Sequence, residues 1–172
     1  MELLKIKKIF DDLGAVNGRK AKEEILNCNK NNILFREILD FVYNPYIVTG
    51  ISSKKIEKDL PMLETMTQDI TCVMDYIKRH NTGRDGDIAF VKTFIKCMPK
   101  ELEEFLVGVF TKNLKVGITA KTINKIFKNL IPEHEVMLAE KYSDNIKRVE
   151  GKEFILSIKL DGTRVTVFNT ID

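Results

Sequence analysis

Apolar residues recur every three or four positions along most of the chain, which is the spacing of amphipathic helices. This pattern predicts helices around residues 3–13, 21–26, 33–42, 66–77, 88–95, 102–110 and 120–128, with irregular structure and one short helix over 45–63. Short polar side chains accept hydrogen bonds from the first backbone N–H groups of a helix. The residues expected to begin helices in this way are Asn31 or Asn32, Ser52 or Ser53, Asp87, and Thr119. We see no low-complexity segment and no solenoid repeat.

The pattern changes near residue 137. Apolar and polar residues alternate over 154–159 and again over 164–168, which predicts two strands joined by a turn. The chain is therefore expected to be mainly α, with an all-helical domain over 1–135 and the first β-hairpin of another domain over 136–172. Two strands alone do not make a stable sheet, so this second domain is expected to be incomplete.

Composition narrows the class of protein only modestly. The 172 residues are 44% hydrophobic and 31% charged, with a net charge of +3, which suits a globular core but identifies no partner. Cys28, Cys72 and Cys97 form no Cys-x-x-Cys pair, so buried, reduced thiols in a cytoplasmic monomer are expected. No apolar run approaches the roughly 20 residues of a membrane span. His80 and His134 have no metal-ligand pattern around them, so no metal site is expected within this chain.

Charge is distributed unevenly along the chain. The segment 105–132 contains no acidic residue and five lysines, which are Lys112, Lys115, Lys121, Lys125 and Lys128. Gly117 and Thr119 come directly before the last predicted helix, whose first N–H groups could meet a phosphate. Lysines beside such a turn predict a site for a nucleic-acid phosphate backbone, formed by Lys112, Lys115, Gly117, Thr119, Lys121 and Lys125. The alternative is an ordinary solvated helix face, although such faces usually mix charge signs.

The turn 82–84 and the aromatic residues give weaker signals for nucleic-acid binding. The turn 82–84 contains Gly83 and Arg84 before a helix, but Asp85 and Asp87 flank it and oppose an anion. Aromatic residues such as Tyr43 and Tyr46 are expected in the core rather than as platforms for base stacking.

A lysine lies at the end of the first predicted strand, in the motif Lys159-Leu160-Asp161-Gly162-Thr163-Arg164. A free lysine amine is protonated at neutral pH and cannot attack an electrophile. Burial and a neighbouring cation such as Arg164 both lower the lysine pKa. The neutral amine can then attack the α-phosphorus of a nucleotide and form a phosphoramide. The alternative is an exposed hairpin with ordinary turn residues.

These blocks together resemble the N-terminal part of ATP-dependent DNA ligases of the viral, T-even-phage type. The resemblance covers nearly the whole chain: the first two helices, the turn 114–118, the segment 130–139, and the Lys-x-Asp-Gly-x-Arg motif all occur in the family's order and spacing. It implies a helical DNA-binding domain followed by the start of an adenylation domain.

The resemblance also implies roles for the motif residues. Lys159 would take AMP from ATP, with Mg²⁺ as the metal cofactor, and the AMP would pass to the 5′-phosphate of nicked double-stranded DNA before the nick is sealed. Ser157, Lys159, Asp161 and Arg164 would contact the nucleotide. The family usually has Glu or Gln at the position of Ser157, so the serine departs from the family pattern. The family's metal ligands come from later motifs, so the 172-residue chain is expected to be inactive alone.

Two alternatives remain open at the level of sequence. An RNA ligase or capping-type nucleotidyltransferase shares the lysine motif, although the long helical N-terminal domain argues against it. A stand-alone DNA-binding protein with a relic hairpin would keep the basic surface without the chemistry.

Overall fold

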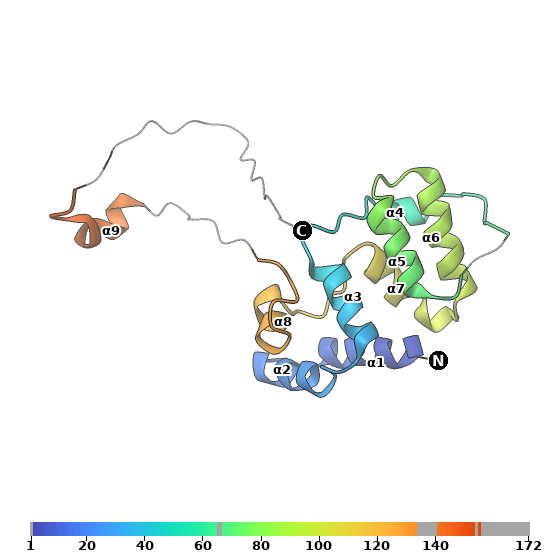
Figure 1. Ribbon diagram of the computed structural model, residues 1–172, viewed down its shortest axis with the longest axis horizontal. Helices are drawn as coiled ribbons and strands as arrows, with labels where there is room; N and C mark the ends of the chain where they lie inside the picture. Colours follow the sequence, from blue (N-terminus) through green and yellow to red (C-terminus); the bar gives the residue numbers. More distant parts are fainter. Residues whose placement is uncertain (1, 65–66, 134–140, 154, 156–172) are drawn as a thin grey trace, which may run out of the picture. The chain divides into compact units, whose positions relative to one another are not determined.

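The computed structural model describes residues 2–64, 67–133, 141–153 and 155. The chain divides into two compact units, Met1–His134 and Glu135–Asp172. Helices are the only regular elements among the described residues (Figure 1), and the prediction of a mainly α chain is confirmed. In the first unit they are α1 (Glu2–Ala15), α2 (Arg19–Cys28), α3 (Ile33–Tyr43), α4 (Ser53–Ile56), α5 (Ile70–Arg79), α6 (Asp85–Cys97), the short 3₁₀ helix η1 (Lys100–Leu102), α7 (Glu103–Phe110) and α8 (Ala120–Ile126).

The second unit contains α9 (Tyr142–Val149), a helix in a charged stretch where no element was predicted. The predicted hairpin over 154–168 lies outside the described residues, apart from Ile155. The boundary after residue 135 stays a prediction. No helix in the described ranges is long and apolar enough to cross a membrane.

Helix starts follow the predicted capping residues with one exception. Asn32 accepts a hydrogen bond from the Phe35 backbone N–H at 2.9 Å, Thr119 caps α8, and Ser52 occupies the cap position of α4. The prediction that Asp87 caps α6 is wrong, because the helix already begins at Asp85. Asp87 is instead the third helical residue, and its carboxylate accepts from the cap residue's N–H, as acidic residues at that position do.

Four side chains expected inside are exposed. Cys28 and Cys97 are the last residues of their helices and Cys72 lies in the first turn of α5, so all three thiols project from helix ends. Tyr46 is 54% exposed in the connection after α3, whereas Tyr43 packs against the core as predicted.

The first unit is built from two halves with the same helix order. Residues 67 positions apart occupy equivalent places, so α1 corresponds to α5, α2 to α6, α3 to η1 and α7 together, and α4 to α8. The buried apolar residues follow the same register, with Ile38 matching Phe105 and Ile51 matching Ile118. This register indicates an internal duplication.

The two halves exchange helices rather than lying side by side. Helix α2 of the first half packs against α8 of the second, and α6 of the second half packs against α4 of the first. Helices α3 and α7 pack against each other between these pairs. Figure 1 shows α8 next to α2 within this unit.

Aromatic rings fill the interior around α3. Phe35 lies near the start of this helix, with its ring 5.2 Å from that of Phe10, which in turn lies 5.4 Å from Phe105. Phe41, near the end of α3, meets Phe110 of α7 at 6.1 Å in an edge-on arrangement. One buried core therefore joins both halves of the duplication.

Gly50 and Gly83 allow two backbone turns to touch where α4 meets α6. Both have left-handed φ angles, of 63° and 61°. A Cβ on Gly83 would lie 2.1 Å from the Gly50 carbonyl oxygen, closer than any real contact of this kind. Gly86, in the first turn of α6, has open space around its Cα instead.

We therefore expect Gly83→Ala to destabilise the first unit by about 2 kcal/mol or more, because it adds left-handed strain to a backbone clash. Gly86→Ala should stabilise it by about 0.4–1 kcal/mol, since it restricts the unfolded chain without a clash. Urea unfolding followed by circular dichroism measures both changes. Equal stability of the two variants would contradict the close approach of the turns.

Candidate nucleic-acid interface

The six residues predicted to bind a phosphate backbone occupy four different environments. Lys112 points into the protein, Lys115 borders a cavity beside α1, and Gly117, Thr119 and Lys121 line a separate depression. Lys125 is paired with the carboxylate of Glu23 on α2.

Lys112 holds the connection between α3 and α4. Its Nζ atom donates to the backbone carbonyls of Asn44 and Ile47, both at 2.5 Å. Desolvation lowers the pKa of this ammonium from its ordinary value, although the nearby Asp40 carboxylate acts in the opposite direction. Two of its three donors are thus committed inside the fold.

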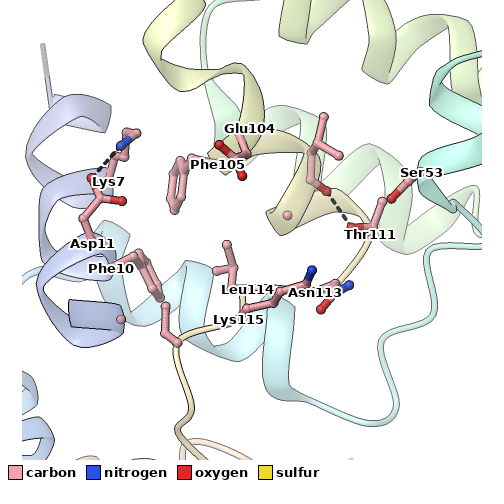
Figure 2. Close-up of a pocket in the computed structure, with 14 residues that line it drawn as sticks. Lys7, Phe10, Asp11, Ser53, Glu104, Phe105, Thr111, Asn113, Leu114 and Lys115 are labelled. Carbon is pink, nitrogen blue, oxygen red and sulfur yellow. Dashed lines mark hydrogen bonds and ion pairs between the residues drawn. The ribbon is translucent and has the colours of Figure 1, made fainter. Parts of the chain in front are cut away.

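Lys115 lies beside a cavity of about 500 Å³ between α1, α7 and the connection after α7 (Figure 2). The rings of Phe10 and Phe105 form part of its apolar lining. Asp11 and Glu104 also line this cavity, so its charge is mixed. A mixed lining is less suited to a phosphate than one with cations alone.

The depression between α2 and α8 is lined by cationic side chains without a carboxylate. It measures about 370 Å³, and we call it the α2/α8 depression. Arg19 and Lys22 come from the start of α2, and Lys121 comes from the first turn of α8. The rest of its lining consists of Gly18, Gly117, Thr119 and Thr122. It brings together residues about 100 positions apart, so the predicted basic surface is extended by α2.

Glu23 of α2 links this helix to α8. Its carboxylate accepts from Arg19 Nε at 2.9 Å and from Lys125 Nζ at 2.6 Å. The bond from Lys125 is the main reason that the pKa of Glu23 lies below its ordinary value. Lys125 therefore helps to tie α8 to α2, and it stays 55% exposed.

The duplication places an equivalent turn where α4 meets α6. Gly50-Ile51-Ser52-Ser53-Lys54 matches Gly117-Ile118-Thr119-Ala120-Lys121 residue by residue. The two glycines have φ angles of 63° and 64°, and the cap residues Ser52 and Thr119 have φ angles of −122° and −123°. Two turns with one conformation therefore begin α4 and α8, each with an exposed lysine two residues after the cap.

The turn 82–84, which touches the Gly50 turn, was predicted only as a weak site because acidic residues flank Gly83. No binding was predicted for the Gly50 turn itself. In the structure Asp85 pairs with Lys58 at 2.9 Å. Asp87 is buried and accepts hydrogen bonds from Tyr76 and from Thr82. Both carboxylates are therefore engaged. The signal that could have identified the Gly50 turn is the Gly-Ile-Ser/Thr-x-Lys sequence that it shares with residues 117–121.

The predicted nucleotide contacts Ser157, Lys159, Asp161 and Arg164 lie outside the described residues. Within the described ranges, no group of three or more His, Cys, Asp or Glu side chains could hold a metal ion.

Comparisons with known proteins point to one class of enzyme. The chain is 28% identical over 169 residues to the DNA ligase of Enterobacteria phage T4, and equally to that of Enterobacteria phage T6. Each alignment covers 92% of this chain and 34% of the ligase, so the chain spans about a third of the length of these curated relatives. The chain thus resembles T-even-phage DNA ligases, as the motifs predicted. No family model matches it.

Solved structures support the fold. Two structures designated Pmar-Lig_Pre. and Pmar-Lig_PreS3 superpose with TM-scores of 0.56 and 0.54. They are 22% and 20% identical to this chain, and the match covers 83% and 84% of it and 35% of each structure. At these identities the likeness concerns the arrangement of helices alone.

The two lysines in the connection after α7 should differ in their effect on stability. We expect Lys112→Met to lower the free energy of unfolding by about 1–2 kcal/mol, because two carbonyls lose a charged donor in a partly solvated position. Lys115→Met should change it by less than about 0.5 kcal/mol, since Lys115 is exposed. Chemical denaturation of both variants measures the difference, and an unaffected Lys112→Met would refute its structural role.

Proposed function

We propose that the chain is the N-terminal part of an ATP-dependent DNA ligase and that its helical unit binds nicked double-stranded DNA. The observation that carries this proposal is the similarity to the T4 and T6 ligases along 92% of the chain. The cationic α2/α8 depression supports it independently, because a phosphate backbone is the ligand that such a surface suits.

The two equivalent turns account for how a duplex could be held. Each presents an exposed lysine, Lys54 on α4 and Lys121 on α8, next to a glycine turn of the same conformation. Arg19 adds a further cation beside the Gly117 turn, and Arg84 follows Gly83 beside the Gly50 turn. Cations and backbone turns read no base edges, so binding is independent of sequence. A nick can occur in any sequence, and a ligase requires such a mode.

The chemical step belongs to Lys159 in this proposal. Its neutral amine attacks the α-phosphorus of ATP, a P–N bond forms, and the P–O bond to pyrophosphate breaks while the amine loses its proton. Mg²⁺ neutralises phosphate charge when it is bound. Ser157, Asp161 and Arg164 surround this lysine in the sequence and are proposed to contact the nucleotide.

Duplex binding should depend on both turns. Lys54→Gln and Lys121→Gln should each weaken binding of the 172-residue chain to a fluorescently labelled nicked duplex roughly three- to tenfold. Each should also reduce the slope of log K against log salt concentration by about 0.9, the value for one lost phosphate contact. The double variant should show the sum of both effects, because the turns lie on different helix pairs.

Lys8→Gln provides the matched control. It removes one exposed lysine from α1, a helix that belongs to neither pair. The proposal of a specific face fails if Lys8→Gln weakens binding as much as the turn variants do. The proposal of DNA binding fails if the wild-type chain binds no duplex at low salt.

Adenylation should require Lys159. In the full-length protein, Lys159→Ala should abolish covalent labelling by radioactive ATP with Mg²⁺, whereas Lys152→Ala, a nearby exposed lysine, should leave labelling intact. The 172-residue chain alone should remain unlabelled. Labelling that persists in Lys159→Ala would exclude this lysine as the nucleophile, and sealing of nicked RNA but not nicked DNA would favour an RNA ligase.

A further inference from the structure

Two lysines make the same unusual contact at the two equivalent turns. Lys22 of α2 donates to the carbonyls of Val116 and Gly117, at 2.5 and 3.2 Å. Lys55 of α4 donates to the carbonyls of Gly50 and Gly83, at 2.7 and 3.3 Å. In both cases an ammonium bridges the carbonyl of the left-handed glycine and one other backbone carbonyl.

The duplication does not explain this correspondence by itself. The residue equivalent to Lys22 in the second half is Ala89, and the residue equivalent to Lys55 is Thr122. The turns of the two halves therefore receive their ammonium groups from two lysines of the first half, which occupy different positions in the repeat. At each turn the carbonyl of the left-handed glycine thus accepts a hydrogen bond from an ammonium, although the two lysines do not match in the repeat.

The physical reason lies in the conformation of the turn. An ammonium that bridges two carbonyls fixes their orientation and therefore the orientation of the peptide that follows each glycine. Lys22 also ties the turn of α8 to α2, and Lys55 ties the turn of α4 to the start of α6. Both side chains are only partly exposed, and two donors of each ammonium are already used.

We propose that Lys22 and Lys55 have the same positioning role on the DNA-binding face, and that each holds one of the two glycine turns rather than contacting phosphate. This inference rests on the proposed binding of nicked duplex. It separates the lysines of the face into two kinds: Lys54 and Lys121 meet the phosphate backbone, and Lys22 and Lys55 set the turns beside them.

Salt dependence of binding distinguishes the two kinds of lysine. The test compares Lys22→Met and Lys55→Met with Lys121→Met and Lys54→Met in the 172-residue chain, with a labelled nicked duplex. Lys22→Met and Lys121→Met each remove one charge beside the Gly117 turn, and Lys55→Met and Lys54→Met each remove one beside the Gly50 turn. We expect Lys22→Met and Lys55→Met to weaken binding at least as much as their partners, roughly tenfold, while the salt slope changes by less than about 0.5. Lys121→Met and Lys54→Met should reduce the slope by about 0.9.

Amide chemical shifts of the free protein provide a readout without DNA. In Lys22→Met the ¹⁵N–¹H signals of Gly117 and Ile118 should move, and in Lys55→Met those of Gly50, Ile51 and Gly83 should move. The signals of Lys121→Met should move only near the mutated residue. Because Lys22→Met and Lys55→Met act on different helix pairs, either variant tests the inference if the other fails to fold.

Each outcome has a definite meaning. A slope reduced by about 0.9 in Lys22→Met and Lys55→Met would show that these lysines contact phosphate and would overturn the inference. If the variants keep the wild-type affinity for the duplex while the glycine amide signals move, the two lysines hold the turns without affecting binding. That result would also overturn the inference. Failure of the wild-type chain to bind duplex would instead refute the proposed function, while the chemical shifts would still report whether the lysines hold the turns.

Discussion

The packing of α3 against α7 is the interaction on which the rest of the first unit depends. Phe35 and Phe41 carry the two ends of α3 into rings from α1 and α7, and both side chains are fully buried. Burial of one such ring contributes about 1.5–3 kcal/mol relative to exposure. Since α3 and α7 are equivalent in the duplication, this one contact fixes the position of each half against the other. It thereby brings α2 beside α8 and α4 beside α6.

Those two helix pairs impose an electrostatic constraint on the fold. Several cations must lie close together on the proposed DNA-binding face, and their repulsion opposes folding. The structure offsets this repulsion with Glu23 between α2 and α8 and with Asp85 beside Lys58, and it directs Lys22 and Lys55 at backbone carbonyls. The face therefore keeps a positive surface without leaving every cation unpaired in the free protein.

Local sequence predicted the helices and most of their caps, because apolar spacing and capping side chains act over a few residues. Asp87 was misassigned because a carboxylate can accept from helix N–H groups from the cap or from the third position. The exposure of Tyr46 and the cysteines depends on where neighbouring helices end. The α2/α8 depression could not be predicted, since its helices are far apart in sequence. The equivalence of the Gly50 and Gly117 turns was overlooked because the two halves share little sequence there beyond Gly-Ile-Ser/Thr-x-Lys. The lysine motif, by contrast, was identified by its own residues.

The exchange of helices between the halves has a consequence for how this unit folds. Neither half alone supplies all the packing partners of α2 and α6, because α2 also packs against α8 of the second half and α6 also packs against α4 of the first. The bond between Lys125 and Glu23 spans 102 positions, and contacts of such long sequence separation slow folding relative to helical bundles with local contacts. During synthesis, α2 must therefore remain without its partner until α8 has left the ribosome. The unit should then fold in one cooperative step, so that the Gly50 and Gly117 turns reach their DNA-binding conformation together.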